Sequence, residues 1–322
     1  MTTDQVLLDT ANRIFADHCD KSLLDAAEAG EFPTALRGLL ADNGFLHLAM
    51  RDSGFALADA FALLRVAGRH GVPIPLAEMM LANRWLDQVD EFATVGVVQQ
   101  LADAPHGAIF GVPWAATAQV VVGIGQVGER TIAVRGGGVT PGANLAGESR
   151  DVVAIEDPLA IDVGDDACFE LLAAARVAQT VGSLERVLEL SLGYANEREQ
   201  FGRPISKFQA VQHNLAILAA EVAAAVRAGD AAIAALGGER QTVEIAVAKA
   251  RVGEAAGVVA EIAHQVHGAM GFTHEHQLHH FTRRAWAWRD EFGNDVYWRR
   301  LLGSHLAGVG ADAVWDFIAT RG

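Results

Sequence analysis

Residues 196–214 read NEREQFGRPISKFQAVQHN, and this stretch joins two long helix-like segments of the chain. Its helix start and stop residues predict a helix that ends at Gly202, a link that contains Pro204, and a second helix that begins at Ser206. Gln209 follows Ser206 by three residues, which is the spacing of a capping box. The start and stop of helices therefore explain the glycine, proline, serine and glutamine without a ligand. They leave the arginine and the aromatic side chains unexplained.

The arginine and the aromatic residues of this stretch have two possible uses. Arg198 stands one turn before the glycine break, where a cation suits the C-terminus of a helix. A guanidinium is also a planar fork for phosphate oxygens, and Phe201 and Phe208 could offer a flat surface beside it. The residues alone leave the structural and the ligand-binding interpretations open.

A second motif, QVHGAMG, occupies residues 265–271 near the end of another helix-like segment. Gln265, Gly268 and Gly271 stand at positions i, i+3 and i+6, with His267 between them. Small residues in this pattern let another backbone or a ligand approach closely, and Gly271 could supply a left-handed helix cap. A purely structural role is again sufficient, so the motif by itself is weak.

The spacing of apolar residues along the chain changes twice, and this pattern predicts an α+β fold that is mainly α. Apolar residues recur at helical spacing over residues 5–88, with Gly44 and Gly71 as expected helix ends. Short β-branched runs between glycines and prolines then predict strands, at 94–98, 118–125, 130–136 and 151–157. Long Ala- and Leu-rich helices follow at 167–197, 207–236, 240–268 and 278–304. We expect an N-terminal helical domain (1–90), a reduced middle β-domain (91–166) and a C-terminal four-helix bundle (167–322).

The composition argues against some classes of binding partner and indicates the cellular compartment. The 322 residues are 51% hydrophobic and carry a net charge of −15, which argues against nucleic acid or an anionic membrane as a partner. Cys19 and Cys168 are far apart and outside any C-x-x-C pattern, so no disulfide framework or thiolate metal site is expected. The start lacks a secretory pattern, and the uncharged stretch 104–128 is broken by glycine and proline. We therefore expect a cytoplasmic protein.

Together, about 65 residues apart in a helical bundle that follows a β unit, the two motifs resemble the C-terminal domain of the acyl-CoA dehydrogenase family. Residues 39–50 and 68–85 also resemble the N-terminal helical domain of that family. The family pattern R-x-x-F-G-x-P-I-x-x-F-Q is matched by Arg198, Phe201, Gly202, Pro204, Ile205, Phe208 and Gln209. The pattern Q-x-x-G-G-x-G is matched by Gln265, Gly268 and Gly271, with Ala269 in place of its second glycine.

The resemblance implies a shared FAD cofactor. In the family these segments hold the pyrophosphate and adenosine half of an FAD whose isoalloxazine ring lies in the neighbouring subunit. The residues that the resemblance assigns to this role are Arg198, Phe201, Phe208, Gln209, Gln265, His267, Gly268 and Gly271. Their side chains suit it, since a guanidinium pairs with phosphate and glycine permits close approach.

The catalytic base of the family is missing. Its usual glutamate position holds Phe292, which cannot accept a proton, and the position that some relatives use instead holds Leu172. Glu291 is a weak alternative, because on a helix a one-residue shift turns a side chain by roughly 100 degrees. Glu170 is no better placed, two residues from Leu172.

Other parts of the chain's own active site are also absent. The family's T-E-x-x-x-G-S-D segment, which serves the flavin ring and the substrate, has no counterpart between Thr94 and Asp166. The family's T-S-Q after the base is replaced by residues 294–296, NDV. The half-site donated to a neighbour is thus retained while the chain's own half is lost, and no catalytic residue is expected here.

This asymmetry resembles the short, non-catalytic subunit of the heteromeric α2β2 acyl-CoA dehydrogenases of steroid-degrading bacteria. The resemblance implies a full-length catalytic partner that binds the acyl-CoA and carries the base, while this chain completes the FAD site. Two flavins per tetramer follow. The steroid assignment is an analogy within the family.

Two other functions remain open. The same fold could serve a flavin-free acyl-CoA-binding or assembly protein, in which Arg198 and Gln265 are structural. Alternatively, the chain could bind a metal through the histidine cluster His274, His276, His279 and His280, whose spacings suit zinc or copper if the segment is helical. No cysteine is near and Arg283 and Arg284 make the surroundings positive, so we expect no metal and favour polar packing at a subunit interface.

Overall fold

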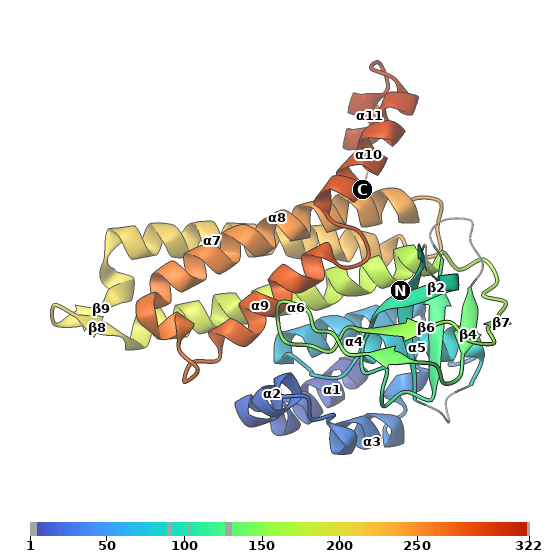
Figure 1. Cartoon of the computed structure of the whole chain (residues 1–322). Helices are drawn as coiled ribbons and strands as arrows, with labels where there is room; N and C mark the ends of the chain where they lie inside the picture. Colours follow the sequence, from blue (N-terminus) through green and yellow to red (C-terminus); the bar gives the residue numbers. More distant parts are fainter. Residues whose placement is uncertain (1–4, 89–91, 102–103, 126–130, 321–322) are drawn as a thin grey trace.

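The computed structural model describes residues 5–88, 92–101, 104–125 and 131–320, with helices on either side of a β sheet in chain order (Figure 1). The predicted class, α+β and mainly α, is confirmed. The predicted domain boundary at residues 90 and 91, and Arg130 at the start of one predicted strand, lie outside the described residues.

The N-terminal part consists of short helices with left-handed residues at the expected stops. Gly71, with φ of 63°, caps the helix Leu57–His70, and Gly44, with φ of 73°, follows the helix Thr34–Asp42 and the residue Asn43. The elements are α1 (Gln5–His18), α2 (Lys21–Glu28), α3 (Thr34–Asp42), the 3-10 turn η1 (Phe45–His47), α4 (Leu57–His70) and α5 (Leu76–Leu86).

A seven-stranded sheet follows, in the order β5-β6-β2-β1-β3-β4-β7. Its strands are β1 (Ala93–Leu101), β2 (Ala104–Val112), β3 (Val120–Ile124), β4 (Ile132–Val134), β5 (Val139–Thr140), β6 (Asp151–Ala154) and β7 (Leu159–Ala160). Strand β1 pairs parallel to β3 and antiparallel to β2. Gly96 lies opposite Gly123, and a Cβ on Gly96 would come within 2.6 Å of Val112, so this pair needs glycine.

Strand β2 is absent from the strands that the sequence predicts. Its glycines read as turn signals, yet Gly111, with φ of 68°, marks an irregularity in the pairing with β6 rather than a turn. A bulge admits an extra residue without ending the strand, which explains why the sequence pattern misled here.

The C-terminal part is a helical bundle with an arm. It contains α6 (Cys168–Glu197), β8 (Glu199–Gln200), β9 (Arg203–Pro204), the 3-10 turn η2 (Ile205–Lys207), α7 (Gln209–Ala234), α8 (Gln241–His267), the 3-10 turn η3 (Gly268–Phe272), α9 (Leu278–Asp290), α10 (Asp295–Val309) and α11 (Val314–Ala319). Helices α6, α7 and α8 match the predicted ranges within two residues. Helices α10 and α11 project from the bundle (Figure 1). Among the described helices, none combines the length and apolarity needed to cross a membrane.

The single helix predicted for 278–304 is wrong, because the chain breaks between α9 and α10. Phe292 and Gly293 adopt left-handed backbone, with φ of 53° and 91°. Asn294 then caps α10, its side-chain oxygen accepting a hydrogen bond from the Tyr297 backbone N–H at 3.0 Å. Phe292, at the position where the resemblance places the family's catalytic base, therefore lies in a bend rather than on a helix.

Helices α4 and α6 join the N-terminal part directly to the bundle. A Cβ on Gly68 would lie 2.0 Å from the Gln179 carbonyl oxygen, and one on Gly182 would lie 1.9 Å from that of Arg65. Glycine on each helix thus faces the backbone of the other, which permits an unusually close approach. One continuous apolar core includes buried residues of the N-terminal helices, of β1 and β3, and of the bundle.

Candidate functional site

The first motif forms the end of α6, a small hairpin and the start of α7. Helix α6 ends at Glu197 and not at Gly202, which corrects the predicted boundary. Phe201 and Gly202, with φ of 53° and 77°, form the turn between β8 and β9. Positive φ at both central residues is the geometry of a tight hairpin turn, so the glycine here serves the hairpin rather than a helix cap.

The predicted capping box at Ser206 is also wrong. Helix α7 begins at Gln209, its N-cap is Phe208, and no side chain caps it. Ser206 lies in η2, and its buried Oγ has no hydrogen-bond partner within the described part of the chain. A buried hydroxyl without a partner is costly, so this atom is a candidate for a contact with a molecule outside the chain.

The arginine and the aromatic residues of the motif lie at the surface. The Phe201 side chain is 93% exposed and packs edge-on near Phe208, with ring centroids 6.1 Å apart. The Arg203 guanidinium covers the Phe208 ring at 4.2 Å. Arg198 is exposed, and among the described residues its side chain has no hydrogen-bond or ion-pair partner. Arg198 therefore remains available for an external anion.

The second motif caps α8 with a different glycine from the expected one. Gly268, with φ of 59°, follows the last residue of the helix, whereas Gly271 is buried. A Cβ on Gly271 would lie 3.0 Å from His267 Cβ and 3.2 Å from a Leu278 methyl group. These neighbours are side chains of the chain itself, whereas the approach of another backbone or a ligand to Gly271 stays a prediction.

His267 belongs to the interior of this motif. Its ring stacks on Tyr194 at 4.5 Å, and its Nδ1 lies 2.7 Å from the Ala263 carbonyl oxygen. Burial lowers the pKa of His267 to about 4, so the ring is neutral at pH 7. The ring thus contacts the Ala263 carbonyl, and the Leu190 backbone also approaches it, while the buried Nε2 makes no hydrogen bond of good geometry in the described structure.

The fold brings the two motifs together at one end of the bundle. Val266 shares a small apolar cluster with Ala195, and Ile205 packs against it. The ends of α6 and α8 thus lie side by side, at the left of Figure 1. Of the residues predicted to bind the cofactor, Phe208 is half-buried, His267 and Gly271 are buried, and the exposed ones are Arg198, Phe201, Gln209, Gln265 and Gly268. We call these eight residues the bundle-end surface.

The two expected base positions hold no proton acceptor. Leu172 is fully buried in the core. The Phe292 ring meets Phe169 edge-on at 6.2 Å, and the Arg176 guanidinium lies over it at 5.3 Å. Glu170 accepts hydrogen bonds from Gln241 and Thr242 at 2.9 and 2.8 Å, so its carboxylate stabilises the start of α8.

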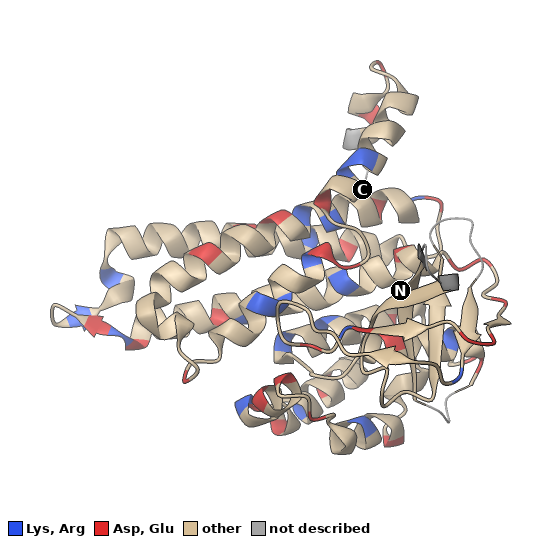
Figure 2. Cartoon of the chain, in the orientation of Figure 1, with Lys and Arg blue, Asp and Glu red and all other residues tan. Residues whose placement is uncertain are grey.

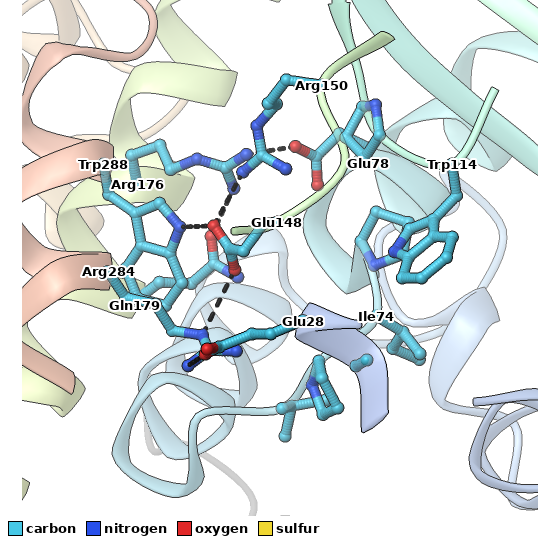
Figure 3. A pocket seen from close by; sticks show the side chains of 15 residues that line it. Glu28, Ile74, Glu78, Trp114, Glu148, Arg150, Arg176, Gln179, Arg284 and Trp288 are labelled. Carbon is cyan, nitrogen blue, oxygen red and sulfur yellow. Dashed lines mark hydrogen bonds and ion pairs between the residues drawn. The ribbon is translucent and has the colours of Figure 1, made fainter. Parts of the chain in front are cut away.

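A small cavity of about 20 Å³ lies where the N-terminal helices, the sheet and the bundle meet, and charged side chains crowd it (Figure 3). Its lining also includes prolines and tryptophans. The charged residues that line it are Glu28, Glu78, Glu148, Arg150, Arg176 and Arg284. Figure 2 shows acidic and basic residues close together in this region, where α8 and α9 approach the sheet.

Arg176 of α6 is the centre of the ion pairs around this cavity. It is 3% exposed and pairs with Glu78 of α5, which is 1% exposed. Its Nε donates to Glu291 at 2.6 Å and its Nη1 to Gln179 at 2.6 Å. Arg150 donates to the same Glu291 carboxylate at 2.8 Å. A buried guanidinium thus ties two carboxylates from distant parts of the chain.

A second group of ion pairs continues the network toward α2. Glu148 accepts hydrogen bonds from the Trp288 indole and Asn144 amide, each at 2.8 Å, and from Arg150 at 3.1 Å. Arg284 lies 3.3 Å from Glu148 and donates to Glu28 at 3.0 Å. We call Glu28, Glu78, Glu148, Glu291, Arg150, Arg176 and Arg284 the interior network.

The interior network is unsuited to acid–base chemistry near neutral pH. Burial raises the pKa of Glu291, but the charges of Arg150 and Arg176 outweigh it and hold this pKa at about 2. A base with so low a pKa has little driving force to take a proton. The side chain of Glu291 points to these arginines from the bend after α9, so the helical argument for its direction was incorrect.

Beside the network lies one lysine whose neutral form is favoured by burial. Lys249 of α8 is buried, and burial lowers its pKa to about 7. Its Nζ donates to the Glu291 carbonyl oxygen at 2.7 Å and to that of Arg289 at 3.1 Å. These are carbonyls near the end of α9, so Lys249 stabilises the bend that carries Phe292.

The interior network was missed in the sequence, although it leaves a signal there. Arg176 is the single charge in the apolar run LLAAARVAQTVGSL (171–184), and Glu78 stands alone in PLAEMMLAN (75–83). A single charged residue on a helix that is apolar on every face is buried together with that helix. It therefore needs a partner of opposite charge. The partner itself is not readable, because the pairing joins residues 98 positions apart.

The histidine-rich segment 274–280 does not act as one cluster. His276 turns to His267, with ring centroids 4.7 Å apart, while His274 meets His279 at 5.5 Å. His280 is fully buried against α2. The predicted loop before α9 is confirmed, and the helical spacing required for the four-histidine site is absent.

Comparisons with known proteins find similarity to acyl-CoA dehydrogenases. The profile "Acyl-CoA dehydrogenase, C-terminal domain" matches residues 166–306. The acyl-CoA dehydrogenase IpdE2 of Mycolicibacterium smegmatis is 28% identical over 296 residues, which cover 87% of this chain and 91% of IpdE2. The matched regions include both motifs of the bundle-end surface.

Two solved structures share the whole fold. The ChsE4-ChsE5 complex of Mycobacterium tuberculosis contains a chain with a TM-score of 0.86 and 23% identity, covering 97% of this chain and 99% of that one. A variant of the Tcur3481-Tcur3483 steroid ACAD has a TM-score of 0.83 and 24% identity, with 95% and 98% covered. The bundle thus matches the C-terminal domain profile of the acyl-CoA dehydrogenases, and the chain as a whole is similar in sequence to one such enzyme and shares the fold of these solved structures.

Proposed function

We propose that the chain is a non-catalytic subunit of a flavin-dependent acyl-CoA dehydrogenase, and that its bundle-end surface completes the FAD site of a catalytic partner. One contrast carries this proposal. Five of the eight residues predicted to bind the cofactor lie exposed at the end of the bundle, and Arg198 among them has no side-chain partner in the described part of the chain. The interior cavity, by contrast, is crowded by ion pairs, and the two base positions hold Leu172 and Phe292.

The bundle-end surface suits the phosphate and adenosine half of FAD. Arg198 is a free guanidinium fork for phosphate oxygens. A Cβ on Gly268 would meet nothing within 4 Å, so the backbone there is open to a ligand. The partnerless Ser206 Oγ and His267 Nε2 add polar atoms near it. The flavin itself would supply hydride acceptance, and the partner would supply its ring site and the base.

The relatives support a hetero-oligomer. The two solved structures named above are assemblies of two named proteins, and one of them is called a steroid ACAD. We therefore propose a full-length catalytic acyl-CoA dehydrogenase as the partner, an α2β2 tetramer with two flavins, and a steroid-derived acyl-CoA bound at the partner's site. The site of action that we propose is the cytoplasm.

Purification of the chain alone and together with its catalytic partner tests the proposal. We expect the chain alone to be colourless and inactive, and the co-expressed complex to be yellow, with one flavin for each copy of this chain. The measurements are flavin absorbance, the flavin-to-chain ratio and acyl-CoA oxidation. Stoichiometric flavin and turnover from the single chain would show the proposal to be wrong. A stable complex without flavin would favour the flavin-free assembly protein instead.

Glu291 provides a second test, because it is the nearest carboxylate to the lost base. We expect Glu291→Gln to leave the turnover of the complex within a few-fold of wild type, since its carboxylate is held by Arg150 and Arg176. Turnover is measured at a temperature where circular dichroism shows the variant folded. A loss of roughly 100- to 10,000-fold, typical of removing a general base, would assign catalysis to Glu291.

A further inference from the structure

Three potential metal ligands from two distant segments meet where α2 contacts α9. Asp25 of α2 and His279 and His280 of α9 place their ligand atoms within 4.8 Å of one another. His280 is fully buried, His279 is half-buried, and the Asp25 side chain is 42% exposed. The site is therefore open to solvent on one side and closed by protein on the other.

The hydrogen bonds of His280 determine which of its nitrogens is free. Its Nδ1 lies 2.7 Å from Glu28 Oε1. The Glu28 carboxylate also pairs with the guanidinium groups of Arg283 and Arg284. The ionised carboxylate only accepts, so Nδ1 carries the proton, and in the neutral ring Nε2 has a lone pair.

The free nitrogen of His280 faces a carboxylate. Its Nε2 lies 3.1 Å from Asp25 Oδ1, yet it is buried and has no hydrogen-bond partner within the described residues. Two lone pairs at this distance repel each other. Either a second proton on the ring or a cation near both atoms is needed to remove the conflict.

His279 also has a ring nitrogen without a partner among the described residues. Its Nδ1 lies 2.8 Å from the His276 carbonyl oxygen, which only accepts, so Nδ1 carries the proton. Its Nε2 is buried and has no partner in the described structure. The two rings are 4.1 Å apart.

The geometry points to a zinc site formed by Asp25 Oδ1, His279 Nε2 and His280 Nε2. Two neutral imidazoles and one carboxylate are ligands that zinc prefers, with solvent completing the coordination. The Glu28 carboxylate that accepts from His280 Nδ1 is the outer-shell partner typical of metal-bound histidine. This set differs from the four-histidine spacing of the sequence, because Asp25 comes from another helix.

The surrounding charges limit the affinity without blocking the site. Lys21 binds Asp25 through Oδ2 at 2.5 Å, which leaves Oδ1 facing His280. Arg283 and Arg284 are nearby, and both pair with Glu28. A metal here would connect α2 of the N-terminal part to α9 of the bundle, across more than 250 residues of sequence.

Zinc titration of the metal-free chain tests the site. We expect one zinc per chain by calorimetry and metal analysis, and a thermal midpoint that rises with zinc concentration by mass action. Asp25→Asn and His279→Ala should each weaken binding at least about 10-fold, the lower bound seen for loss of an outer-shell partner. Both side chains are partly exposed, so these variants should fold. His47→Ala, which removes an exposed histidine from η1, is the matched control and should bind zinc as the wild type does.

Two results would overturn the zinc site. One is a wild-type chain that binds no zinc, in which case a doubly protonated His280 between Glu28 and Asp25 resolves the conflict. The other is equal affinity in wild type and in the Asp25→Asn, His279→Ala double variant, which would place the metal elsewhere. Neither result affects the proposed flavin role, because the zinc ligands and the bundle-end surface share no residue.

Discussion

Arg176→Met is expected to lower the free energy of unfolding by about 3–5 kcal/mol, the cost of removing one partner from a buried ion pair. The substitution leaves Glu78, 1% exposed, without its arginine, and it leaves Glu291 with one guanidinium, that of Arg150, in place of two. Urea unfolding followed by circular dichroism measures the change. A loss below about 1 kcal/mol would contradict a structural role for the interior network.

Two further variants separate the buried charge from other effects. Arg176→Met combined with Glu78→Leu should recover part of the loss, because apolar residues can replace both partners of a buried pair at little cost. Arg69→Ala is the matched control, since Arg69 pairs with Glu189 at 2.7 Å but is 45% exposed. This surface pair should contribute no more than about 1 kcal/mol.

Acid unfolding gives an independent measure of the same network. The pKa of Glu291 is about 2 in the fold against an ordinary 4.5, so its contribution to stability is complete above pH 4.5 and is lost as the pH falls toward 2. Arg176→Met removes one of the two guanidiniums that lower this pKa. The variant should therefore lose less stability than the wild type between pH 4.5 and pH 2.

Arg198→Ala should weaken FAD binding in the purified complex by roughly 10- to 150-fold. This corresponds to the roughly 1.5–3 kcal/mol of a charge-assisted hydrogen bond. The proposed role in binding the pyrophosphate rests on an exposed guanidinium without internal partners. Flavin occupancy should fall, added FAD should restore activity, and the complex should stay assembled because the bundle core is untouched.

The controls for Arg198 distinguish a fork from a charge. Arg198→Lys should restore only part of the affinity, since an ammonium keeps the charge but lacks the planar donors. Arg227→Ala removes the same charge from an exposed position on α7, where Arg227 is 84% exposed, and should leave occupancy unchanged. Unchanged occupancy with loss of the assembly in Arg198→Ala would instead make Arg198 a structural residue at the end of α6.

The sequence predicted well those features that depend on neighbouring residues. Apolar spacing located α6, α7 and α8 within two residues, and Gly44 and Gly71 marked true helix stops. Glycine as a local signal led to wrong predictions where the same residue could serve two different structures. Gly202 serves a hairpin turn instead of a helix cap, and Gly111 lies at a sheet irregularity instead of a loop. A glycine indicates unusual φ, but not which structure uses it.

The sequence by itself determined the helical and strand-rich segments and the two motifs of the bundle-end surface, because each is written in residue type and short-range spacing. Only the tertiary structure decided the partners of Arg176, the direction of Glu291 and the meeting of Asp25 with His280. These contacts join residues 98, 115 and 255 positions apart. Their energy comes from burial and charge in one enclosed place, and no pattern along a single segment records which distant side chain will share it.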